Sequence, residues 1–100
     1  MQDYCIVVTE ASTGIEVWNI TQELDNSTPL QLSAEIRSEL KFYAHRIAGA
    51  PAHVVNGWSV TFTTQLNEGG ELSSEVPRGT LTIVPEPGAE IELEWRAELV

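Results

Sequence analysis

The chain has 100 residues, of which fifteen are acidic and five basic, so its formal net charge at pH 7 is −10. This charge disfavours direct binding to nucleic acid or to an anionic membrane, because both require cationic surface that displaces counterions. A chain of 100 residues is typical of a single domain, and we expect residues 1–100 to form one. The lone cysteine, Cys5, excludes an internal disulfide framework.

We expect no targeting signal at the N-terminus. Residues 1–8 have no basic flank and only a short apolar run, a pattern that does not predict a signal peptide. No segment approaches the roughly 20 apolar residues that a membrane span needs. We therefore expect a cytoplasmic protein whose single thiol stays reduced.

The beginning of the chain is typical of a β-hairpin. Residues 4–9 are β-branched and aromatic, residues 11–14 form a turn that ends in glycine, and residues 15–20 return as a second strand. A polar loop is expected at 23–28. Because the first strand is apolar on both faces, part of the outer face of the sheet should be apolar. A loop such as residues 68–79, or another protein, would cover it.

A helix is the element with the clearest signals. Thr28 fits the N-cap, Pro29 fits the first helical position, and Gln31 completes a capping-box pattern. Gly49 and Pro51 indicate the end of the helix. Apolar residues recur at spacings of three or four and form a core-facing stripe: Leu32, Ile36, Leu40, Tyr43 and Ile47.

Three further strands are expected after the helix. The first alternates Trp58, Val60 and Phe62 with Ser59, Thr61, Thr63 and Gln65, and residues 80–84 form a short strand. The last alternates Ile91, Leu93, Trp95, Ala97 and Leu99 with Glu90, Glu92, Glu94, Arg96 and Glu98. The order ββαβββ predicts an α+β fold, with one helix packed on a mostly antiparallel five-stranded sheet.

Motifs for catalysis and for metal binding are absent. The sequence has no Gly-x-x-x-x-Gly-Lys loop, no Gly-x-Ser-x-Gly elbow, no His-Glu-x-x-His pair and no Cys-x-x-Cys. A metal site built from Cys5, His45 and His53 would need a tertiary proximity that their spacing does not indicate. We expect no enzymatic activity, no cofactor and no metal.

The most distinctive feature is the acid row, which we define as Glu90, Glu92 and Glu94, with Glu98 further along the same face. Neighbouring carboxylates lie about 6.7 Å apart along a strand and repel by about 0.6 kcal/mol in water. Because this cost is small, the row fits a solvated face, protection of an edge strand, or a surface for basic residues of a partner. The polar side of the third strand would extend such a surface if the two strands share a sheet.

Phe42 lies outside the apolar stripe, among Glu35, Ser38, His45 and Arg46. An exposed aromatic next to arginine is typical of a contact anchor, although a long loop would equally cover it. Three of the five basic residues, Arg37, Lys41 and Arg46, fall in the predicted helix. The helix side should therefore be nearly neutral and the sheet side acidic.

These features predict a non-enzymatic inhibitor or adaptor that occupies a basic surface on another protein. Phage-encoded inhibitors of nucleic-acid-handling defence enzymes, and immunity proteins for basic nuclease toxins, are of this physical type. The comparison rests on size and charge alone. The predicted contact residues are Glu90, Glu92, Glu94, Glu98, Phe42 and Arg46.

Two alternatives use self-association. In the first, a structural or assembly protein forms a homodimer through the strands at 4–9 and 15–20, whose apolar faces become a subunit interface. In the second, an oligomer binds a small molecule in a pocket between subunits near Trp18 or Trp58.

Overall fold

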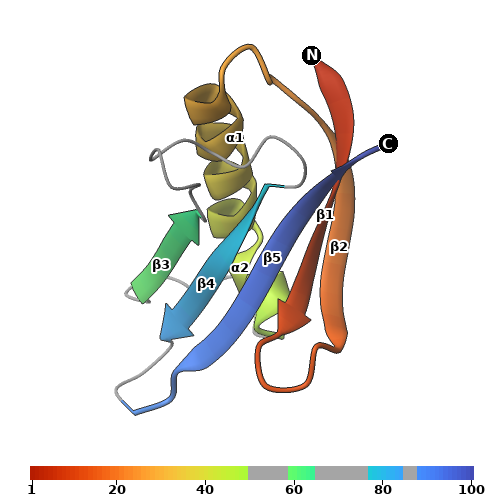
Figure 1. The fold of residues 1–100 in the computed structure, drawn as a ribbon. Coiled ribbons are helices and arrows are strands. Elements are labelled where there is room, and N and C mark those ends of the chain that lie inside the picture. The colour runs from red at the N-terminus through yellow and green to blue at the C-terminus, as the bar shows by residue number, and fades with distance from the viewer. Residues whose placement is uncertain (50–58, 65–76, 85–87) are drawn as a thin grey trace, which may run out of the picture.

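A computed structural model describes residues 1–49, 59–64, 77–84 and 88–100. In Figure 1 the helices lie against one face of a five-stranded sheet, so the predicted α+β class is confirmed. The elements are β1 (Gln2–Glu10), β2 (Glu16–Leu24), α1 (Pro29–Phe42), α2 (Ala44–Ile47), β3 (Ser59–Thr64), β4 (Arg78–Val84) and β5 (Ile91–Leu99). The predictions for His53, Trp58, Gln65 and 68–76 lie outside the described residues.

The sheet has the strand order β2-β1-β5-β4-β3, and every pair of neighbours is antiparallel. The last strand along the chain, β5, is therefore the central strand of the sheet, hydrogen-bonded to β1 on one side and to β4 on the other. The interpretation of the acid row as protection of an edge strand is wrong, because β5 has no free edge.

The second strand is longer than expected. It runs through Leu24, whose side chain is 1% exposed, so the polar loop predicted from residue 23 begins only at Asp25. The extension pairs Leu24 with Gln2, and the core then gains an additional leucine. Burial of this single apolar side chain overrides the polar character of its neighbours in the sequence.

A β-bulge in β2 changes which face its residues occupy. Val8 pairs with Trp18, whereas the next residue of β1, Thr9, pairs with Glu16, so Val17 is the extra residue. In a regular strand Glu16 and Trp18 would share a face. The bulge instead places Trp18 against the core and Glu16 on the opposite face of the sheet.

The start of the main helix agrees with the sequence. The Thr28 hydroxyl oxygen accepts a hydrogen bond from the backbone N–H of Gln31 at 3.0 Å, and Pro29 is the first residue of α1. This bond satisfies one of the N–H groups that have no partner inside the helix.

The predicted single helix is wrong at its C-terminal end, because α1 stops at Phe42. Tyr43 leaves helical geometry with φ −97° and ψ 10°, and the short α2 begins at Ala44. The change of backbone direction buries Ala44 completely and leaves Tyr43 only half-buried. The buried residues of the two helices are Leu32, Ile36, Leu40, Ala44 and Ile47.

The core lies between the helices and the facing side of the sheet, and Trp95 is the largest side chain fully buried in it. Its indole N–H donates to the backbone carbonyl of Thr63 at 2.9 Å, and its ring stacks on Phe62 with centroids 5.1 Å apart. To reach β3, the indole crosses β4 at Gly79, which is its register partner. A Cβ at Gly79 would overlap the Thr63 carbonyl and lie 2.8 Å from Trp95 Nε1.

Replacing Gly79 with alanine should therefore lower the free energy of unfolding by about 3 kcal/mol, because the added methyl group meets backbone that has no room to move. Urea denaturation measures this loss. Gly49→Ala is the matched control, since Gly49 has φ +73° and open space around it. That change should cost about 1 kcal/mol from backbone strain alone. Equal losses in the two variants would contradict the close approach of Trp95 to Gly79.

Candidate functional site

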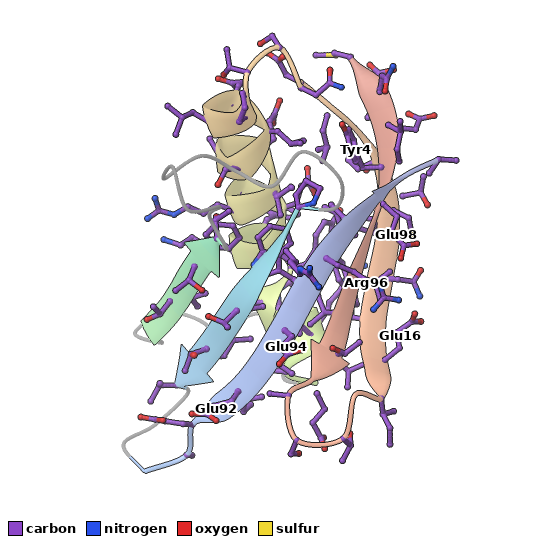
Figure 2. All side chains as sticks on the ribbon, viewed as in Figure 1. Tyr4, Glu16, Glu92, Glu94, Arg96 and Glu98 are labelled. Atoms are coloured by element: carbon purple, nitrogen blue, oxygen red, sulfur yellow. The ribbon has the colours of Figure 1, made fainter. Side chains whose placement is uncertain are left out.

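The face of the sheet that points away from α1 and α2, which we call the open face, carries the predicted acidic residues of β5. Figure 2 shows Glu92, Glu94, Arg96 and Glu98 along this strand, and the three glutamates are exposed. Glu94 has Thr9 and Thr80 as its cross-strand partners, and Glu92 pairs with Thr82. These carboxylates therefore lie on the middle strand of the sheet, beside threonine side chains of the two neighbouring strands.

The polar side of β3 belongs to the same surface. Thr63 pairs with Thr80, and Thr61 pairs with Thr82. Since Thr80 and Thr82 are the partners of Glu94 and Glu92, the expected extension of the acidic face by hydrogen-bonding groups is confirmed for Thr61 and Thr63.

Carboxylates from the N-terminal hairpin join the open face. Glu16 pairs with Thr9, which also pairs with Glu94, so the two glutamates are separated by two strand spacings, or about 10 Å. The described charged residues on this face are six carboxylates and two guanidiniums: Asp3, Glu16, Glu23, Glu92, Glu94, Glu98, Arg78 and Arg96. Their sum of −4 contrasts with α1 and α2, which carry two glutamates and three basic residues, Arg37, Lys41 and Arg46.

Arg96 interrupts the row of glutamates and neutralises part of it. Its Nε donates to Glu98 Oε1 at 2.8 Å, and both side chains are about half exposed. An ion pair at such exposure contributes about 0–1 kcal/mol. Glu98 is therefore already paired, whereas Glu92 and Glu94 take part in no salt bridge within the described parts of the chain.

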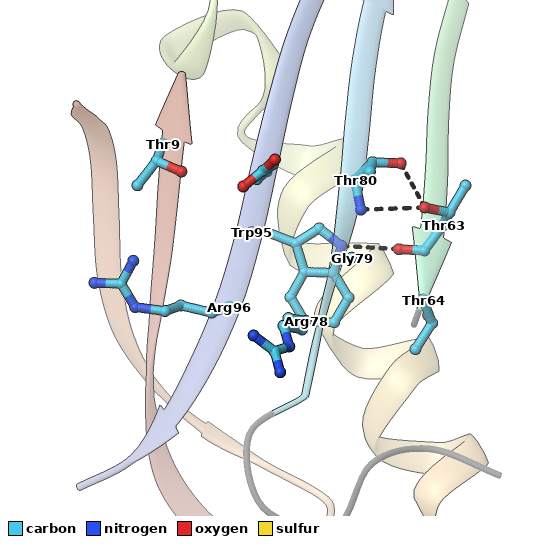
Figure 3. A pocket seen from close by; sticks show the side chains of 9 residues that line it. Thr9, Thr63, Thr64, Arg78, Gly79, Thr80, Trp95 and Arg96 are labelled. Carbon is cyan, nitrogen blue, oxygen red and sulfur yellow. Dashed lines mark hydrogen bonds between the residues drawn. The ribbon is translucent and has the colours of Figure 1, made fainter. Parts of the chain in front are cut away.

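Arg96 also covers apolar surface on the open face. Val7, its register partner on β1, is only 4% exposed although it lies outside the helix-side core. Figure 3 shows the Arg96 side chain reaching toward β1. The expected apolar outer patch is thus small, with Val7 buried and Cys5 half-buried beside it. The aliphatic part of an arginine side chain provides such cover while its charge stays in water.

A second arginine, Arg78, lies directly opposite Arg96 in the register of β4 and β5. Like charges in this position repel, and Figure 3 shows the two guanidinium groups pointing in different directions. They line a depression of about 520 Å³, in which the Thr63 and Thr80 hydroxyls bond to each other. The sequence did not reveal this pair because the register between two strands depends on non-local pairing.

Phe42 and Arg46 belong to the helix side of the molecule. Phe42 is 71% exposed and packs edge-on against Tyr43, with ring centroids 4.9 Å apart. The ring centroids of Tyr43 and Trp18 are 5.3 Å apart, and Cζ of Arg46 lies 5.7 Å from the centroid of the Tyr43 ring. The position of Phe42 outside the apolar stripe is confirmed, and of the two alternatives that the sequence left open, the exposed one agrees with the structure. The six predicted contact residues nevertheless fall on two surfaces, since α1 and α2 lie against the sheet face opposite the glutamates of β5.

Glu90 precedes β5 instead of lying within it, and its side chain is exposed. It lines a depression at the hairpin end of the sheet together with Glu92. The acid row therefore ends at a pocket and not on a flat strand surface.

Within residues 1–49, 59–64, 77–84 and 88–100, no group of three His, Cys, Asp or Glu side chains is placed to hold a metal ion. Cys5 lies on the open face opposite Thr21 and Glu98, and His45 is half-buried on α2. In the same part of the chain, no helix has the length and apolar character needed to cross a bilayer.

Two carboxyl groups outside the open face have shifted acidities. Burial raises the pKa of Glu39, and the nearby charge of Glu35 raises it further. The backbone N–H and hydroxyl of Ser27 hold the pKa of Asp25 below its ordinary value. A raised pKa in the folded state means that the Glu39 charge opposes folding at neutral pH.

Glu39→Gln should therefore raise the free energy of unfolding at pH 7 by about 0.3 kcal/mol, the size of an i, i+4 repulsion. The folded pKa of Glu39 exceeds its ordinary 4.5, so its contribution to stability is greatest below pH 4.5 and is lost as the pH rises through the folded value. The difference between variant and wild type should vanish near pH 3.5 in urea denaturation. A difference that is equal at the two pH values would contradict this assignment.

Phe42→Ala should change the free energy of unfolding by less than about 0.5 kcal/mol, because the side chain is mostly exposed. Ile36→Ala on the same helix is the control, since Ile36 is fully buried and its truncation should cost about 3 kcal/mol. Thermal or urea denaturation of both variants gives the comparison. A loss at Phe42 similar to that at Ile36 would show that Phe42 is part of the core.

Comparison with known proteins returned no match: no family model, no curated protein and no solved structure is similar to this chain.

Proposed function

We propose that this chain is a small, acidic, non-enzymatic binding protein that occupies a basic surface on another protein through its open face. The observation that supports this proposal most directly is the position of Glu92 and Glu94. Both are exposed on the central strand, on the face that α1 and α2 leave free, and neither takes part in a salt bridge among the described residues. Glu16 adds a third carboxylate across β1.

The central strand suits this role because its backbone is rigid. Hydrogen bonds to β1 and β4 hold β5 on both edges, so the carboxylates of Glu92 and Glu94 are presented with little backbone entropy left to lose on binding. A surface of one dominant sign also accelerates encounter with a partner of the opposite sign. Exposed carboxylates on the open face suit a target surface that is basic in the way a nucleic-acid-binding surface is basic.

Within this class, the proposed role is an inhibitor or adaptor. The physical type is that of phage-encoded inhibitors of defence enzymes and of immunity proteins for basic nucleases, a parallel that rests on small size and acidic charge.

A second candidate is an oligomeric assembly protein, favoured by one observation. β2 is an edge strand, and the residues at its start expose apolar surface, with Ile15 65% and Val17 43% exposed. The other strand of the predicted interface, β1, is paired on both edges, which leaves β2 for any edge-to-edge contact. Light scattering at two protein concentrations separates the candidates, since a salt-resistant dimer supports assembly and a monomer supports the acidic binding role.

The charge reversal Glu92→Lys with Glu94→Lys should abolish capture of basic proteins while changing the free energy of unfolding by less than about 1 kcal/mol, because both side chains are exposed. The measurement is affinity capture with immobilised wild type and variant, followed by association rates of each captured protein at low and high salt. Wild-type association should be fast and should slow strongly as salt increases.

The control must match the charge change on the other side of the molecule. Gln31→Lys, Ser38→Lys and Glu39→Lys together add four charge units on α1, as the two glutamate reversals do on β5. This control should retain the captured proteins. If the variant with lysines on β5 retains them equally well, the open face is not the binding surface and the proposal is wrong.

A further inference from the structure

The hairpin end of the sheet contains a depression of about 730 Å³, which we call the end pocket. Its volume is within the roughly 300–1,000 Å³ range of ligand-binding clefts. Its apolar lining comes from the bulge of β2, the end of α2 and the start of β5: Val17, Ile47, Ala48, Ile91 and Leu93. Its acidic lining consists of three carboxylates: Glu10, Glu90 and Glu92.

The end pocket lies beside the C-terminal end of the described helices. α2 ends at Ile47, and Gly49 at φ +73° takes the backbone out of helical geometry. Leu93 at the base of the pocket is 3% exposed, whereas Val17 at its rim is 43% exposed. The bulge that displaces Val17 from the regular ladder therefore provides part of the apolar wall.

Among the described residues that line the end pocket, none supplies a counter-charge to its carboxylates. The lining contains no lysine or arginine among the described residues. Glu10 Oε1 accepts hydrogen bonds from the Ser12 and Thr13 hydroxyls at 3.0 and 3.1 Å, which orient this carboxylate without neutralising it. The pocket therefore combines an apolar wall with a fixed negative charge.

The end pocket is continuous with the proposed binding surface. Glu92 lines the pocket and also stands next to Glu94 on the open face. A segment bound along the acid row therefore passes the mouth of the pocket at Glu90 and Glu92.

This geometry selects the chemistry of its occupant. An uncharged apolar group would desolvate the carboxylates without compensation, and a purely cationic group would leave the apolar wall unfilled. We infer that the end pocket takes an apolar side chain of the partner protein that is flanked by lysine or arginine. This inference rests on the proposed function and assigns to the same partner a mixed basic and apolar contact segment.

The test uses two amidated and acetylated pentapeptides, Lys-Lys-Leu-Lys-Lys and its matched control Lys-Lys-Ser-Lys-Lys. Their charges are equal, so a difference in affinity reports the apolar side chain alone. Isothermal titration at low salt should show the leucine peptide binding about tenfold more tightly, the factor expected for burial of most of one leucine side chain. In the NMR spectrum, the methyl signals of Ile47, Ile91 and Leu93 should shift with the leucine peptide and not with the serine peptide.

Two variants locate the preference in the end pocket. Val17→Lys places a cation at the exposed rim, and Ala48→Phe fills the pocket. Either change should reduce the preference for leucine to less than twofold. Gln22→Lys makes the same charge change on β2 at the opposite end of the strand and should keep the preference. Val17 and Gln22 are both exposed, so their substitutions test the inference even if Ala48→Phe fails to fold.

The outcomes separate this inference from the proposed function. If both peptides bind equally and weaken together with salt, the acidic face binds cations but the inference is wrong. It is also wrong if neither peptide binds, or if Val17→Lys and Ala48→Phe leave the preference unchanged. If the protein forms a dimer that Val17→Lys abolishes, a second copy of the chain is the occupant and the inference is overturned. Glu94→Lys with Glu98→Lys leaves every pocket residue in place, so unchanged binding of the serine peptide to this variant would refute the proposed function alone.

Discussion

The hydrogen bond from the Trp95 indole to the Thr63 carbonyl is the constraint on which the arrangement of the sheet depends. To make this bond, the indole of Trp95 crosses β4 at Gly79, which has no side chain to block it. Its Nε1 then lies 2.9 Å from the backbone oxygen of Thr63 on β3. The contact ties three strands together through one side chain and sets the lateral position of β3. Because neighbouring residues of a strand point to opposite faces, burial of Trp95 directs Glu94 to the open face. The largest group in the core thus determines where the central carboxylate stands.

Local patterns predicted much of the fold. The Thr28 hydroxyl and Pro29 specified the first turn of the helix, and the structure confirms both. Strict alternation along β5 predicted its buried and exposed faces, which the structure confirms from Glu92 to Glu98, whereas Leu99 at the end of the strand is exposed. The predicted ends of the helix and of β2 were wrong, because tertiary burial of Ala44 and Leu24 determines where these elements end. The neighbouring residues in the sequence carry no signal for this burial. The opposition of Arg78 and Arg96, and the end pocket, follow from strand order and register. Such non-local pairing leaves no periodic trace in a single sequence.

The topology changes the meaning of the acid row. On an edge strand, glutamates prevent pairing with other chains, but β5 lies between β1 and β4 and needs no such protection. Solubility does not require charge at the centre of the open face either, since exposed positions on loops and strand ends serve equally well. Phe42 and Arg46 stand on the other side of the sheet, so a partner that covers the open face does not reach them. A contact at Phe42 would belong to a second, separate interaction.

The charges of the open face repel one another in the folded protein, and under the proposed function they also attract the partner. Glu16, Glu92 and Glu94 repel one another in the folded protein, and the ion pair of Arg96 with Glu98 relieves only one end of the row. Salt screens this repulsion and so raises the stability of the free protein, whereas the same screening weakens attraction to a basic partner. A fold held together by Trp95 and its apolar neighbours tolerates this repulsion, because the hydrophobic contribution does not depend on the surface charges. If salt raises the free energy of unfolding and also slows association with a basic partner, these carboxylates favour binding and oppose folding.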